Sequence, residues 1–156
     1  MPVMPLLKKL VASRVFYAFV FCVFIPFLLW NGVRAWEPFM KLSPIHSPAG
    51  GILLMLAGAV LMGGSMTALK RKGGGLPMNA FPPPRFVSSG FYRLVPHPIY
   101  WGFCLACAGV SLLAGSAGGL YVMTPLAALG CLSIVWGYER QDLIRRFGTS
   151  APPTLM

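Results

Sequence analysis

The chain has 156 residues, of which 56% are hydrophobic and only 10% are charged. Soluble domains carry about 25% charged residues, so this composition excludes an ordinary soluble fold and predicts a single membrane domain over residues 1–156. The formal net charge is +10, but the basic residues lie between long apolar runs, which favours contact with anionic lipid head groups over nucleic-acid binding.

Four apolar runs predict four transmembrane helices, at about 15–33, 49–69, 99–114 and 120–137. The first two approach the roughly 20 residues that cross a bilayer core. The last two are shorter, and the uncharged connection from Gly115 to Gly119 predicts a tight helical hairpin. Basic residues before the first run resemble the start of a signal peptide, but no cleavage site of small residues follows, so we expect a retained span.

The segment after the fourth run, 138–147, has an apolar face formed by Leu143, Ile144 and Phe147. Basic side chains on its other faces are typical of a helix that lies at the lipid surface. The predicted fold class is therefore an all-α integral membrane protein, with four transmembrane helices and a cytoplasmic interfacial helix at the C-terminus. The loop 70–98 joins the second and third spans.

The basic residues orient these spans. Eleven of the thirteen Lys and Arg residues fall before the first span, in the loop 70–98, or after the fourth span. With four spans these segments share one side, and the positive-inside rule places that side in the cytoplasm. We therefore expect both termini in the cytoplasm and the protein in a bacterial inner membrane.

Three patterns indicate packing more than chemistry. Cys104 and Cys107 have a C-x-x-C spacing, but no second pair or nearby histidine completes a tetrahedral site, so no metal is predicted. The spans lack the buried acids and histidines of proton pathways, which gives a transporter little support. Small residues at four-residue spacing, such as Ala59 and Gly63, favour packing within the chain, and we expect a monomer or a weak homo-oligomer.

Ionisable and aromatic residues gather where the third span begins and the fourth ends. His97 and Tyr100 lie at one of these ends and Glu139 at the other, so a hairpin would bring them together in one pocket. An acid near anionic lipid is unfavourable, and Glu139 therefore indicates a cationic partner, either a loop arginine or a bound ligand. His97 has an equally simple structural interpretation, because it precedes Pro98 at the start of a helix.

Two segments resemble motifs of the isoprenylcysteine carboxyl methyltransferase-like family, whose members also resemble phospholipid N-methyltransferases. The first segment is 75–102 and the second is 139–148. The matching positions are Gly90, Tyr92, Arg93, His97, Pro98, Tyr100 and Gly102 in the first, and Glu139, Leu143, Phe147 and Gly148 in the second. Two positions differ from the family pattern, Pro96 before the histidine and Arg140 after the acid.

The resemblance implies methyl transfer from S-adenosylmethionine to a lipophilic acceptor, such as a prenylcysteine-like carboxylate or a phospholipid amine. It implies a catalytic or orienting role for Arg93 and Glu139. The residues expected to bind the cofactor are Tyr92, His97, Pro98, Tyr100, Gly102, Glu139 and Phe147. Two alternatives stay open, a non-catalytic assembly protein of the same fold and a small transporter.

Overall fold

The computed structural model describes residues 16, 19–75 and 84–147, and this part of the chain is all-helical, as predicted. Parts of the predicted first span and of the loop 70–98 lie outside the described residues. The elements, in chain order, are η1 (Val20–Phe24), α2 (Ile25–Met40), α3 (Pro48–Ala68), η2 (Leu69–Gly73), α4 (Phe91–Leu94), α5 (Pro98–Ala114), η3 (Gly119–Met123), α6 (Thr124–Ile134), η4 (Val135–Glu139) and α7 (Arg140–Phe147). The elements marked η are single wide turns of π-helix.

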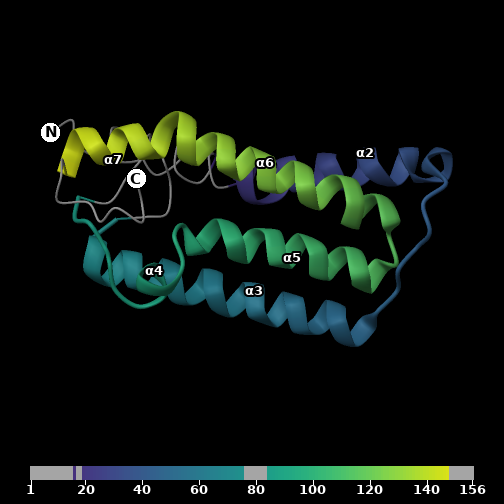
Figure 1. Cartoon of the computed structure of the whole chain (residues 1–156), viewed down its shortest axis with the longest axis horizontal. Helices are drawn as coiled ribbons and strands as arrows, with labels where there is room; N and C mark the ends of the chain where they lie inside the picture. Colours follow the sequence, from purple (N-terminus) through teal and green to yellow (C-terminus); the bar gives the residue numbers. More distant parts are fainter. Residues whose placement is uncertain (1–15, 17–18, 76–83, 148–156) are drawn as a thin grey trace, which may run out of the picture.

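Glycines hold α3 and α5 side by side along their length (Figure 1). A Cβ atom on Gly58 would lie 2.6 Å from the carbonyl oxygen of Gly102, and one on Gly109 would lie 2.8 Å from that of Gly51. Only glycine permits such close approach of two backbones. The small residues that form this contact are seven apart, whereas Ala59 and Gly63 are exposed. The prediction that the pair Ala59–Gly63 packs within the chain is therefore wrong.

Helix α2 packs on the opposite side of the hairpin. Val33 joins Cys107, Met123 and Ala127 in a buried apolar cluster, with partly buried side chains of α2 around it. Figure 1 shows α2 behind α6. The contacts between elements place the hairpin of α5 and α6 between α2 and α3, since α5 packs on α3 and η3 packs on α2. The predicted hairpin of the third and fourth apolar helices, α5 and α6, therefore lies between the other two helices of the bundle.

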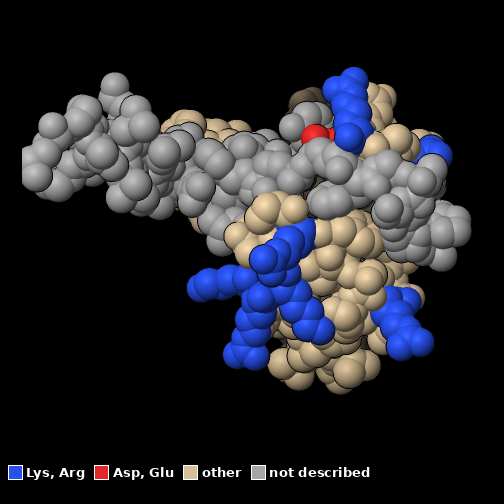
Figure 2. Space-filling view, turned by 90° about the vertical axis from the view of Figure 1, so that its left-hand side faces the viewer, with Lys and Arg blue, Asp and Glu red and all other residues tan. Residues whose placement is uncertain are grey.

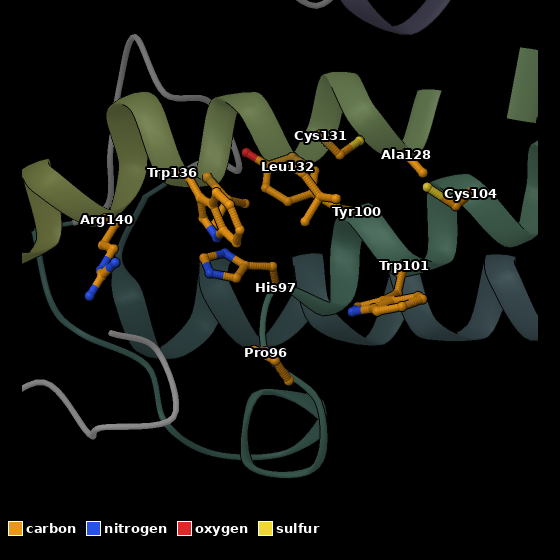
Figure 3. Close-up of a pocket in the computed structure, with 11 residues that line it drawn as sticks. Pro96, His97, Tyr100, Trp101, Cys104, Ala128, Cys131, Leu132, Trp136 and Arg140 are labelled. Atoms are coloured by element: carbon orange, nitrogen blue, oxygen red, sulfur yellow. The ribbon is translucent and has the colours of Figure 1, made fainter. Parts of the chain in front are cut away.

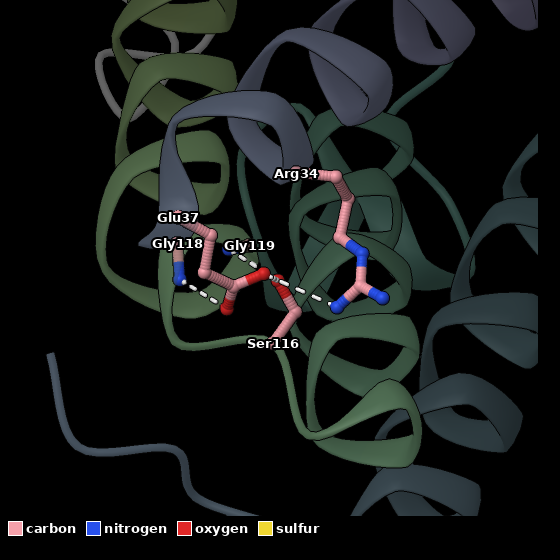
Figure 4. A network of polar contacts seen from close by, with 5 residues as sticks. All are labelled: Arg34, Glu37, Ser116, Gly118 and Gly119. Atoms are coloured by element: carbon pink, nitrogen blue, oxygen red, sulfur yellow. Dashed lines mark hydrogen bonds and ion pairs between the residues drawn. The ribbon is translucent and has the colours of Figure 1, made fainter. Parts of the chain in front are cut away.

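A carboxylate fastens α2 to the turn between α5 and α6 (Figure 4). The backbone N–H of Gly118 donates to Glu37 Oε1 and the Ser116 hydroxyl donates to Oε2, both at 3.1 Å. Arg34 pairs with Oε2 at 3.1 Å from within α2. Burial raises the pKa of the Glu37 carboxyl, but the hydrogen bonds from Gly118 and Ser116 and the charge of Arg34 outweigh it, so the pKa is lowered overall.

This lowered pKa predicts a pH-dependent contribution to stability. A carboxyl whose pKa is lower in the folded state stabilises the fold above its unfolded pKa, and the contribution is lost as the pH falls through the folded pKa. Glu37→Gln should therefore lower the melting temperature at pH 7, and the gap to wild type should shrink as the pH falls below 4.5. Thermal unfolding in detergent at pH 7 and pH ~3 measures both gaps. A gap of equal size at the two pH values would contradict this role.

Two of the described helices are long and apolar enough to cross a membrane, Pro48–Gly73 and Gly119–Arg145. The apolar helix Pro98–Ala114 is shorter. The predicted boundary between a fourth span ending at 137 and a separate helix over 138–147 is wrong, because α6, η4 and α7 follow one another without a break. The predicted connection 115–119 is also shorter than expected, since Ala117 and Gly118 are already helical. The orientation of α7 relative to the lipid surface stays a prediction.

The basic segments of the described chain lie at one end of the bundle. In Figure 1 the end of α3, α4 and α7 lie together at the left, far from the turn between α5 and α6. Figure 2 looks onto this end and shows several groups of Lys and Arg side chains, with acidic atoms beside one of them. The exposed basic residues of these elements are Lys70, Arg71, Lys72, Arg93, Arg140 and Arg145. This grouping agrees with the predicted orientation, for which the membrane side stays a prediction.

Candidate functional site

A cavity of about 280 Å³ lies between α5 and the helix formed by α6, η4 and α7, towards the basic end (Figure 3). Its wall is largely apolar, and its polar groups converge where α5 begins and η4 ends. The lining residues are Pro96, His97, Tyr100, Trp101, Cys104, Ala128, Cys131, Leu132, Val135, Trp136 and Arg140. An apolar cavity with a few convergent polar groups is the usual form of a small-molecule site.

His97 directly precedes α5 and has a strained backbone conformation. Its backbone is left-handed, with φ 50° and ψ 53°, although it precedes a proline. A left-handed conformation costs a residue other than glycine about 1–2 kcal/mol, and proline further disfavours helical angles before it. The strain turns the chain sharply from the loop into α5 and aims the imidazole into the cavity, where it stacks with the Tyr100 ring at 6.0 Å between centroids. Strain of this kind is concentrated at functional sites.

Glu139 meets His97 from the other side of the hairpin. Its Oε2 lies 3.4 Å from His97 Nδ1, and the two side chains are 28% and 13% exposed. This oxygen is fully buried and accepts no hydrogen bond from any of the described residues. Glu139 closes η4, and such wide turns within helices are frequent at functional sites. The predicted meeting of the histidine and the acid is therefore observed, and it leaves one carboxylate oxygen unsatisfied.

The short helix α4 brings a phenol to the same place. The Phe91 ring occupies the space that a side chain on Gly64 would need, and Lys72 Nζ donates to Ser89 Oγ at 2.8 Å. These contacts fix α4 against α3 next to the basic end. Burial, followed by the charge of Glu139, raises the pKa of Tyr92 to about 12. Tyr92 therefore stays a neutral hydrogen-bond donor near Glu139 at physiological pH.

The remaining predicted residues lie around this centre in different ways. Pro98 is fully buried in the first turn of α5. Gly102 faces α3, where a side chain would collide with Gly58 and Met62, so it is a packing residue and does not line the cavity. Arg93 is exposed on α4 and also does not line the cavity. Phe147 ends α7, but its side chain lies outside the described residues.

Sequence reasoning missed the face of the last helix that lines the cavity. Ala128, Leu132, Trp136 and Arg140 are four residues apart and therefore lie on one side of a continuous helix. The spacing was readable in the sequence, but the expected break after residue 137 separated Arg140 from the other three. Cys131 on the same helix and Cys104 on α5 also line the cavity, with their sulfurs turned towards each other in Figure 3.

The sequence pattern of the family described as phospholipid methyltransferase matches residues 47–150. This match covers more than half of the chain and includes α3, α5, the cavity and the His97–Glu139 pair. The chain belongs to the phospholipid methyltransferase family. No curated protein and no solved structure matches it.

Membership of the phospholipid methyltransferase family identifies the fold as that of a membrane methyltransferase. Its apolar helices agree with membrane association. Within residues 19–75 and 84–147 no group of three His, Cys, Asp or Glu side chains is arranged to hold a metal ion. What this methyltransferase offers a ligand is instead a buried carboxylate oxygen, an imidazole, a neutral phenol and an apolar cavity beside them.

Proposed function

We propose that this methyltransferase transfers a methyl group from S-adenosylmethionine to a lipophilic acceptor at the cytoplasmic face of a bacterial inner membrane. The observation that carries the proposal is the contact of 3.4 Å between His97 Nδ1 and Glu139 Oε2 at the edge of the apolar cavity. The basic end of the bundle supports the cytoplasmic placement, because positively charged segments stay on that side.

The polar groups beside the cavity fit the cofactor. A buried carboxylate oxygen without a hydrogen bond needs a partner, and a cationic ligand supplies one to Glu139. Tyr92, a neutral phenol near Glu139, can donate to a ligand oxygen. When bound, S-adenosylmethionine supplies an electrophilic methyl group on a positively charged sulfur. The aromatic rings of Tyr92 and Tyr100 favour that charge through their faces.

The apolar wall fits the acceptor. Side chains of α5 and α6 offer an alkyl chain a surface without water, and the exposed Trp101 and Trp136 are of the type that lies at membrane interfaces. The tasks of the protein are then to align the two reactants and to exclude water. A carboxylate acceptor is its own nucleophile. An amine acceptor must first lose a proton, for which His97 and Glu139 are the nearby bases.

Labelled methyl transfer tests this proposal. Membranes that contain the protein are supplied with S-adenosylmethionine carrying a radioactive methyl group, and the label is counted in the organic extract. His97→Ala should lower the rate of incorporation at least about tenfold, because the imidazole contacts both the cavity and Glu139.

The other histidine provides a matched control. His46 lies at the opposite end, where its Nε2 is 3.1 Å from the carbonyl oxygen of Leu113. His46→Ala should keep the rate of the wild type within about twofold, provided both variants are present at equal levels in the membrane. Incorporation that is unaffected by His97→Ala, or absent in the wild type with every lipid extract offered, would contradict the proposed function.

A further inference from the structure

We propose that Arg140 is the anion-binding residue of the acceptor cavity, and that the cavity selects an amphiphile whose head group is a carboxylate or phosphate over a neutral one. The inference rests on the proposed function, since it names the class of acceptor. It concerns a residue whose side chain lies beside His97 at the polar end of the cavity, as Figure 3 shows.

The charge of Arg140 sets it apart from the rest of the cavity lining. Arg140 is the one lining side chain with a permanent charge, and the lining contains no acid. Two acid–base contacts are seen between described side chains, Arg34–Glu37 and His97–Glu139, and neither includes Arg140. A guanidinium has five donors in a planar fork, which suits a carboxylate or phosphate.

The cavity has a polar end and an apolar end. Trp136 and Leu132 lie one and two turns before Arg140 on the same helical face, and Cys131 and Ala128 continue the wall away from it. The cation therefore stands at one end of an apolar strip. An amphiphile matches this arrangement with its head group at Arg140 and its alkyl chain along the strip. A cationic head group would meet Arg140 and lose its hydration without a partner.

Fluorescence quenching tests the inference without cofactor or turnover. The protein is placed in phosphatidylcholine nanodiscs, and dibrominated stearate or its methyl ester is added, since bromine quenches the nearby Trp101 and Trp136. The two probes have the same tail and differ in the charge of the head group. Wild type should bind the carboxylate about tenfold more tightly than the ester, which corresponds to about 1.4 kcal/mol. Dibrominated acyl phosphate esters distinguish a phosphate head group from a carboxylate.

Variants of the two arginines on α7 decide the result. Arg140→Gln should abolish the preference for the anion while leaving the binding of the ester unchanged, and Arg140→Lys should keep part of it. Arg145→Gln removes the same charge from the same helix, outside the cavity lining, and should keep the full preference. The inference is overturned if wild type binds both probes equally, or if the two Gln variants behave alike.

The outcomes separate this inference from the function on which it rests. Intact methyl transfer together with no anion preference would overturn the role of Arg140 and leave the methyltransferase reaction standing. An anion preference that depends on Arg140, in a protein that transfers no methyl group, would support the binding site and contradict the reaction.

Discussion

Gly58→Ala is expected to destabilise the protein by about 2–3 kcal/mol, although it adds a single methyl group. The new Cβ would lie 2.6 Å from the carbonyl oxygen of Gly102 and 3.0 Å from the backbone nitrogen of Ala106. Both neighbours are backbone atoms, so no side chain can move aside and the two helices must separate. Because His97 directly precedes α5, this separation should also disturb the cavity. Unfolding by sodium dodecyl sulfate in mixed micelles measures the loss.

Gly63→Ala is the matched control on the same helix. Apart from the backbone of its own helix, no described atom lies within 4 Å of where a Cβ on Gly63 would stand, and the residue is exposed. Alanine is the better helix former by up to about 1 kcal/mol, so this variant should be as stable as the wild type or slightly more stable. Equal losses for the two variants would show that glycine at 58 is not required by the contact between α3 and α5.

The second large effect is expected at the acid. Glu139→Gln should weaken the binding of S-adenosylhomocysteine by about tenfold to a hundredfold, because a hydrogen bond to a charged group contributes about 1.5–3 kcal/mol. S-adenosylhomocysteine retains the ammonium group that is proposed to pair with Glu139 Oε2, which is buried and accepts no hydrogen bond from the described residues. Calorimetry with the purified protein in detergent measures the affinity. Glutamine has the same shape, so the fold should be retained.

A second acid on the next helical turn controls for the change in charge. Asp142→Asn removes one negative charge at the same end of the bundle, and Asp142 does not line the cavity. The affinity of the Asp142→Asn variant for S-adenosylhomocysteine should stay within about twofold of that of the wild type. Full affinity in Glu139→Gln, or an equal loss in both variants, would show that the acid is no part of the cofactor site.

The helices were largely predictable because length and hydropathy are local properties of the sequence. α3 and α5 begin and end close to where the apolar runs and their flanking prolines indicate. The continuous last helix was missed because Gly137 and the first charged residues were interpreted as a boundary, whereas η4 carries the helix past them. The contact between α3 and α5 was also missed. Seven-residue spacing in two distant segments has meaning only once the segments are known to be neighbours.

The contact between His97 and Glu139 could be predicted from the sequence, but which of the other residues face the cavity could not. The topology of a hairpin sufficed to bring His97 and Glu139 together, and the structure places them in contact. Whether a residue faces the cavity or the neighbouring helix depends on the rotation of α5, which a motif does not encode. Gly102 therefore faces α3, and Arg93 lies outside the cavity lining. Arg140 lines the cavity because the last helix is continuous and places it on the same face as Leu132 and Trp136.

A double-mutant cycle on the affinity for S-adenosylhomocysteine tests whether His97 and Glu139 belong to one cofactor site. It compares wild type, His97→Ala, Glu139→Gln and the double variant by calorimetry. Side chains in contact usually show interaction energies of about 0.5–3 kcal/mol. If His97 and Glu139 form one cofactor site, the double variant should bind little more weakly than the weaker single variant. Losses that simply multiply, or single variants that bind as well as the wild type, would contradict a shared site.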